Sequence, residues 1–158
     1  MVTQNGLTQI TALVGAFTGI AALVLSITNY LRDSPKLTVK LLWDMSITDN
    51  PGYDRNTFWG IVTVANVGRR PIHVRVANLR LPKGHAASHL VLSEGIAGKT
   101  LAEGAPPAIF IISQDGMQEY ARDWRKIRAA IYDSAGREYL SPRTPRKDSV
   151  PSWAKVKI

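Results

Sequence analysis

An uncharged, apolar run near the N-terminus constrains this chain more than any other feature. From Ile10 to Ile27 the sequence reads ITALVGAFTGIAALVLSI, in which only Thr11, Thr18 and Ser26 are polar. As a helix this run is about 27 Å long, and its uncharged flanks extend it to the roughly 30 Å of a bilayer core. Hydroxyl groups can bond back to the preceding helical turn, so they cost little in lipid. The sequence predicts one transmembrane helix from Leu7 to Leu31.

Two other structures contain apolar segments of this length. A buried core helix needs other elements around it, but the remaining chain is short and rich in strand patterns. A cleaved signal peptide needs basic residues before its apolar run, whereas the first basic side chain here is Arg32. Ser26-Ile27-Thr28 is also a poor cleavage site. We therefore expect a membrane span rather than either alternative.

The charges around this helix predict its orientation. Arg32, Lys36 and Lys40 follow the apolar run closely, and no basic side chain precedes it. Positively charged flanks of membrane helices stay on the cytoplasmic side. The predicted location is the cell membrane, with a single pass, the N-terminus outside and the C-terminal domain in the cytoplasm.

One side of the predicted helix is built from small and hydroxyl-bearing residues. Small residues let two helix backbones approach closely in lipid, and hydroxyl groups can bond across such a seam. The pattern predicts self-association or docking to another membrane helix, with coincidence as the alternative. The residues of this expected helix–helix interface are Thr8, Thr11, Gly15, Thr18, Gly19 and Ala22.

The rest of the chain carries all of the charge. The formal net charge is +8, and no Asp, Glu, Lys or Arg precedes Arg32. A basic domain favours anionic partners, and for a tethered domain the nearest polyanion is the lipid bilayer. Nucleic acid is not expected as a partner, because neither a recognition helix nor interleaved exposed aromatic residues are evident. The absence of cysteine excludes disulfides, thiolate zinc sites and cysteine nucleophiles.

Short segments with alternating polarity follow the Ser34-Pro35 break. Seven candidate strands with no βαβ alternation predict a mainly β fold, an antiparallel sandwich with one short helical piece at 117–124. The expected domains are an anchor (1–33), the β-sandwich (35–141) and a basic, proline-containing tail (142–158) that is extended or partly disordered. The candidate strands are Leu37–Met45, Phe58–Val67, Pro71–Leu81, His89–Ser93, Ala108–Ser113, Lys126–Tyr132 and Arg137–Leu140.

Two segments carry a resemblance to known proteins. The stretch IVTVANVGRRPIHVRVANLRLPKG (Ile61–Gly84) and the closing AAIYDSAGREYLSP (Ala129–Pro142), placed behind a membrane helix, resemble small single-pass bacterial or phage membrane proteins. In that group a C-terminal immunoglobulin-like β-sandwich follows the helix, and the function is mostly unknown. The resemblance implies an antiparallel immunoglobulin-like β-sandwich preceded by one N-terminal transmembrane α-helix, and it implies no catalytic residue.

Candidate chemical motifs are weak. His85 and His89 are four residues apart, but they follow Pro82-Lys83-Gly84 in an expected loop, so we interpret them as exposed loop histidines. Gly95–Thr100 ends in a GKT but lacks the spacing and the flanking helix of a phosphate-binding loop. Glu119 and Asp123 are explained by surface ion pairs. We therefore predict no catalytic residue, no cofactor and no metal site.

The C-terminal tail contains the last cluster of cations. On a domain tied beside a membrane, such a cluster can contact anionic lipid headgroups, with a simple solvated surface as the alternative. The expected anionic-surface contacts are Arg143, Arg146, Lys147, Trp153, Lys155 and Lys157.

Together these patterns predict a membrane-tethered interaction module that presents a small basic β-sandwich at the cytoplasmic face. Its partners would be the bilayer and a protein, or a second copy through the helix. The alternative is a regulatory, immunity or phage–host interference protein that acts on membrane machinery. An enzyme ranks third, because no set of nucleophile, base and orienting residue can be named.

Overall fold

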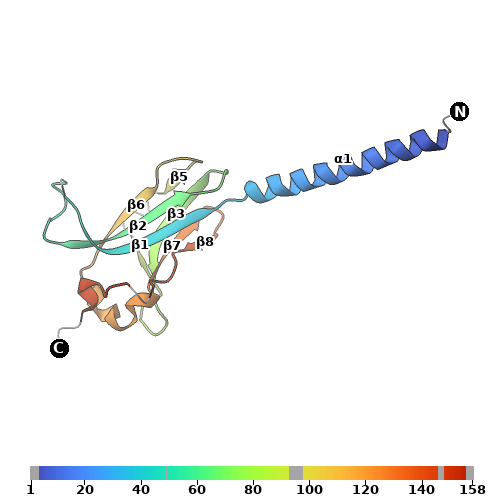
Figure 1. Ribbon diagram of the computed structural model, residues 1–158. Helices are drawn as coiled ribbons and strands as arrows, with labels where there is room; N and C mark the ends of the chain where they lie inside the picture. The colour runs from blue at the N-terminus through green and yellow to red at the C-terminus, as the bar shows by residue number, and fades with distance from the viewer. Residues whose placement is uncertain (1–3, 49, 93–97, 146–147, 156–158) are drawn as a thin grey trace. The chain divides into compact units, whose positions relative to one another are not determined.

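The N-terminal unit is a single long helix. The structure, a computed structural model, describes residues 4–48, 50–92, 98–145 and 148–155, and the chain divides into two compact units, Met1–Ser34 and Pro35–Ile158. Helix α1 runs from Gln4 to Arg32 (Figure 1). The candidate span Thr8–Arg32 contains an 18-residue stretch with a mean hydropathy of 2.2 and no buried residue, so the helix is long and apolar enough to cross a membrane. The predicted N-terminal helix is confirmed as a helix, and its insertion into a membrane remains a prediction.

The hydroxyl groups of α1 are accommodated within the helix itself. The Thr18 hydroxyl donates to the carbonyl of Val14 at 2.8 Å, and the Thr28 hydroxyl donates to the carbonyl of Val24. This is the back-bonding that lets threonine remain in an apolar helix at little cost.

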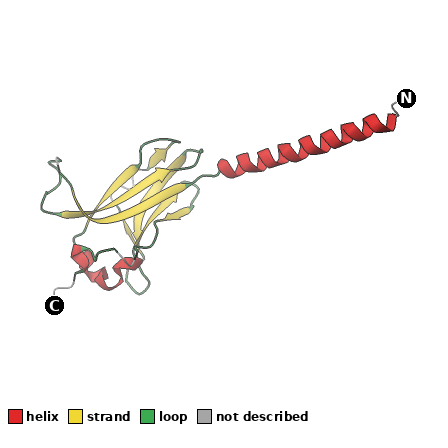
Figure 2. Cartoon of the chain, in the orientation of Figure 1, coloured by secondary structure: helices red, strands yellow, loops and turns green. Residues whose placement is uncertain are grey.

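The second unit is built from antiparallel strands, drawn as arrows in Figure 2. One sheet has three strands in the order β1-β2-β6, and the other has five, in the order β4-β3-β7-β8 with β5 also paired to β3. The strands are β1 (Leu37–Ser46), β2 (Phe58–Asn66), β3 (Ile72–Arg80), β4 (His89–Val91), β5 (Lys99–Leu101), β6 (Ala108–Ser113), β7 (Arg128–Asp133) and β8 (Glu138–Leu140).

Both sheets contribute to one hydrophobic core. Val62, Val64 and Phe110 from the three-stranded sheet belong to the same buried cluster as Leu79 and Ile131 from the five-stranded sheet. Alternation along each strand places these side chains on one face. The predicted mainly β, antiparallel unit is therefore confirmed.

A β-bulge in β1 changes the face to which its last residues belong. Leu42 pairs with Ile61, but the next paired residue is Met45, opposite Trp59. Asp44 lies in this irregularity with a φ of 56°, in the left-handed region that aspartate tolerates better than most residues. Met45 consequently lies on the outer face with Leu42. Strict alternation along the strand would instead place Met45 on the inner face with Trp43.

The C-terminal segment folds back onto the β domain. Two short 3-10 helices, η2 (Met117–Lys126) and η3 (Ser152–Ala154), lie side by side at one end of the sheets, orange to red in Figure 1. Trp153 is only 7% exposed and belongs to the hydrophobic core. Residues 142–145 and 148–150 have no helix or strand and are mostly exposed, as expected of an extended tail, but Trp153 is buried, because a large aromatic side chain gains more by burial than by exposure.

Candidate functional site

The predicted helix–helix interface lies on one side of α1. Because α1 is continuous, its turn of 3.6 residues places the six residues within an arc of about 100°. A Cβ added at Gly15 or Gly19 would meet no atom within 4 Å, so the backbone is accessible there. The structure thus groups these residues as expected, and association through them remains a prediction.

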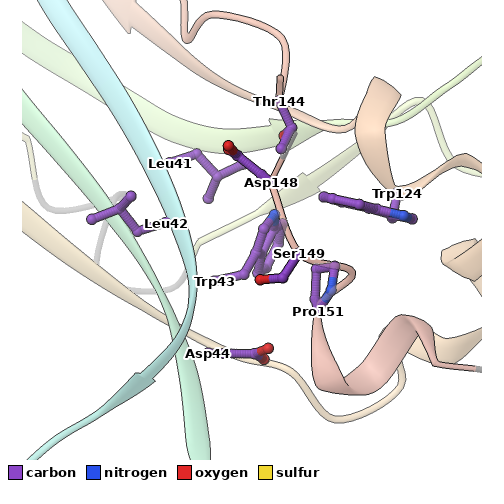
Figure 3. Close-up of a pocket in the computed structure, with 9 residues that line it drawn as sticks. All are labelled: Leu41, Leu42, Trp43, Asp44, Trp124, Thr144, Asp148, Ser149 and Pro151. Carbon is purple, nitrogen blue, oxygen red and sulfur yellow. The ribbon is translucent and has the colours of Figure 1, made fainter. Parts of the chain in front are cut away.

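A cavity of about 320 Å³ lies where the C-terminal segment crosses β1. The ring of Trp43 meets that of Trp153 edge-to-face, with centroids 5.2 Å apart. The Asp44 carboxylate accepts hydrogen bonds from the Ser152 backbone N–H at 2.7 Å and from the Ser152 hydroxyl at 2.6 Å. The lining residues, drawn in Figure 3, are Leu41, Leu42, Trp43, Asp44, Trp124, Thr144, Asp148, Ser149 and Pro151.

The contacts in this cavity assign it a structural role. The Asp44 and Asp148 carboxylates lie well apart in Figure 3, so they do not form an acid–base pair. Asp44 is already occupied by two hydrogen bonds from Ser152. Among the described residues, no group of three or more His, Asp or Glu side chains could hold a metal ion. The cavity is the seam along which the C-terminal segment is attached to the sheet.

One of the expected anionic-surface residues does not lie at the surface. Trp153 is buried against Trp43, which corrects its expected position at the surface. Lys155 and Arg143 are exposed, and Arg143 lines a different cavity, at the end of β3. Three further members of the predicted cluster lie outside the described residues: Arg146, Lys147 and Lys157.

The histidines are accounted for by local contacts. The Nδ1 atom of His73 lies 2.9 Å from the Thr100 hydroxyl. His85 packs edge-to-face on Tyr120, 4.8 Å between centroids, and its Nε2 lies 3.9 Å from Asp123. His89 begins β4 and lies 3.0 Å from the Ser88 hydroxyl. Two of these contacts join a histidine to a hydroxyl, but among the described contacts neither His73 nor His89 has a carboxylate partner that would orient it as a base.

The GKT motif is part of a strand. Lys99 and Thr100 belong to β5, which pairs with the start of β3, and Gly98 precedes them with a φ of 70°. The remainder of the motif, residues 95–97, lies outside the described part of the chain. A phosphate-binding loop leads into a helix, whereas this segment leads into a strand.

The sequence analysis missed an apolar surface on the three-stranded sheet. Leu42, Ile61 and Ile111 form one row across β1, β2 and β6 on the face turned away from the core. Leu42 is 49% exposed, and Ile109, one row along on β6, is 58% exposed. The bulge adds Met45 to the same face. The sequence signal was present, since β2 and β6 carry apolar residues at successive positions rather than alternating ones.

Aromatic rings extend this apolar surface. Trp59 follows the row along β2, and Tyr53 packs on it edge-to-face with centroids 5.1 Å apart. Lys40 is the charged residue in the neighbouring row, opposite Thr63. We call the surface formed by Leu42, Met45, Tyr53, Trp59, Ile61, Ile109 and Ile111 the apolar sheet face.

Comparison with known proteins finds no family model that matches the chain and no curated protein that is similar to it.

Proposed function

We propose that this chain is a membrane-tethered interaction module. In this proposal α1 spans the cell membrane, and the unit from Pro35 onward is an immunoglobulin-like β-sandwich at the cytoplasmic face. The sandwich binds a protein through the apolar sheet face, and the small-residue side of α1 supports helix–helix association. The support for a sandwich is the single core shared by two antiparallel sheets.

The exposed apolar sheet face is the observation that carries the binding proposal. Contiguous exposed apolar patches are uncommon on monomeric soluble domains and mark interaction surfaces. Aromatic residues and methionine are enriched at such surfaces, and Trp59, Tyr53 and Met45 occur on this one. A protein partner fits this face better than a lipid surface does, because contact with anionic headgroups favours a basic face. Among the described paired positions of β1, β2 and β6, Lys40 is the one charged residue beside these rows.

Photo-crosslinking in intact membranes tests this binding. A photo-reactive phenylalanine analogue in place of Ile109 should give a discrete crosslinked band, because this exposed side chain lies on the proposed interface. The band mass distinguishes a second 17.4 kDa copy from a different protein. The matched control is the same analogue in place of Arg75, which is exposed on β3 of the other sheet. Absence of a band at Ile109, or an equal band at Arg75, would contradict the proposal.

The orientation is tested with reporter fusions. A cytoplasmic reporter fused after Ile158 should be active and an exported reporter silent, because the cations that follow the apolar run favour the cytoplasm. A variant with the positive charge moved to the N-terminal flank of the helix should invert the two reporter signals. It carries Arg32→Gln, Lys36→Gln, Gln4→Lys and Asn5→Lys. A wild type that activates only the exported reporter would refute a cytoplasmic domain.

A further inference from the structure

A second cavity of about 320 Å³ is strongly basic. It lies at the end of β3, where β3 leaves the five-stranded sheet and where η2 leads into β7. Of the seven described residues that line it, five are cations and none is a carboxylate. The lining residues are Arg80, Leu81, Pro82, Lys83, Lys126, Arg128 and Arg143.

Two of these arginines occupy paired positions on neighbouring strands. Arg80 of β3 is the register partner of Arg128 of β7. Like charges at opposed positions of an antiparallel pair destabilise it, since their Cβ atoms are only about 4.5–5.5 Å apart. A bound anion between the two side chains would remove this repulsion. Such a pair lowers the stability of the fold, and binding of an anionic ligand can offset this loss.

The protein itself holds the arginines in place. The Nε–H group of Arg128 donates to the backbone carbonyl of Ser141. The Nη1 atom of Arg80 lies 3.2 Å from a Glu138 carboxylate oxygen, and the other oxygen of Glu138 accepts a hydrogen bond from the Tyr132 hydroxyl at 2.8 Å. That bond to Glu138, with partial burial, raises the pKa of Tyr132, so its hydroxyl stays protonated as a donor. Such fixed side chains lose less entropy when they bind a ligand.

Cationic charge nevertheless exceeds the neighbouring anionic charge. Asp123 pairs with Lys126 at 2.7 Å, and this contact lowers the pKa of Asp123. The carboxylates of Glu138 and Asp123 are thereby engaged by two of the five cations. Within the described part of the chain, Lys83 and Arg143 form no ion pair that would neutralise them. The cavity is left with an excess of positive charge.

We propose that this cavity binds a ligand that carries two or more phosphate groups. Guanidinium groups match phosphate oxygens with two parallel hydrogen bonds, and lysine adds a point charge. The cavity volume suits a small ligand rather than a polymer. A single carboxylate would leave most of the cationic charge uncompensated, whereas two phosphate groups balance it.

This site is independent of the apolar sheet face, which belongs to the other sheet. It is also far from the point where the domain is attached to α1. Pro35 and Ile72 line a separate cavity at the start of β3, and the nine residues of β3 separate Ile72 from Arg80 by about 27 Å. The phosphate groups can belong to a soluble molecule or to a lipid headgroup, so both sources are tested.

The experiment is calorimetric titration of the full chain in phosphatidylcholine nanodiscs at about 0.1 M salt. The soluble probe is inositol 1,4,5-trisphosphate, and the lipid probe is vesicles of phosphatidylcholine with phosphatidylinositol 4,5-bisphosphate. Lys83→Gln with Arg143→Gln should weaken binding about tenfold or more, because two charge-assisted contacts are lost. The matched control is Arg69→Gln with Arg70→Gln, which removes the same charge near the other end of β3.

The site is supported if either probe binds the wild type, binds the cavity variant more weakly, and binds the control variant as tightly as the wild type. The soluble arm alone identifies a free phosphate compound, and the vesicle arm alone identifies a headgroup. No binding in either arm overturns the proposal. Equal weakening by the control variant also overturns the proposal, because net charge would then explain the attraction. Citrate, an anion without phosphate, overturns it too if it binds as tightly as the phosphate probes.

Discussion

Replacing Trp153 with alanine is expected to reduce the free energy of unfolding of the β domain by about 3–5 kcal/mol. The indole ring is buried in the core and packs edge-to-face on Trp43, so its removal leaves a cavity as well as lost contacts. Domains of this size are stable by only about 5–15 kcal/mol. Thermal unfolding of the full chain in detergent, followed by circular dichroism of the β signal, should show a large fall in Tm.

The matched control for this variant is Val150→Ala in the same segment. Val150 is exposed, and surface substitutions of this kind change stability by about 0.5 kcal/mol or less. Asp44→Ala should fall between the two, because it removes both acceptors of the Ser152 hydrogen bonds. If Trp153→Ala melts like Val150→Ala, the C-terminal segment is not part of the folded domain, and the seam in Figure 3 is wrong.

Introducing a side chain at Gly60 is expected to have the second largest effect. A Cβ at this position would lie 2.8 Å from the Cζ3 and 2.9 Å from the Cε3 of Trp43, closer than side chains pack. The Trp43 ring cannot move freely, because Trp153 packs against it. Gly60→Val should therefore destabilise the domain by about 1–3 kcal/mol, although glycine is itself a poor strand residue.

A double-mutant cycle separates this clash from a general intolerance of substitution. Gly60→Ala should cost stability in the wild-type background and little or nothing in a Trp43→Leu background, where the smaller side chain leaves room. Gly52→Ala serves as the control, since a Cβ there makes only ordinary contact with the Asn50 side chain. Additive effects of Gly60→Ala and Trp43→Leu in chemical denaturation would show that the ring does not lie over Gly60.

The candidate sites illustrate what a single sequence can reveal about function. The cations of the basic cavity were visible as isolated residues, but Arg80 and Arg128 are 48 positions apart along the chain, and only strand register makes them partners. The apolar sheet face was partly visible in the apolar runs of β2 and β6. A continuous apolar run is typical of a strand covered on both faces, so exposure of its second face could not be inferred without the tertiary structure.

The sequence by itself determined the features that depend on local patterns. An uncharged run of helix length produces α1, because its backbone hydrogen bonds and its back-bonded hydroxyls are satisfied within the segment. Short segments with alternating or continuous apolar residues, bounded by turn residues, indicated most strands, and six of the seven candidates start within one residue of the observed strands. The exception is β7, which starts at Arg128 rather than Lys126, because η2 extends through Lys126.

Tertiary structure decided the features that depend on distant residues. β5 is only three residues long and exists as a strand because β3 offers it a free edge. The bulge at Asp44 turns Met45 outward, and the Ser152 groups that bind Asp44 lie 108 positions away. Trp153 is buried because Trp43 and the core provide a surface for it. In each case the stabilising partner is remote in the chain, and a local pattern contains no information about it.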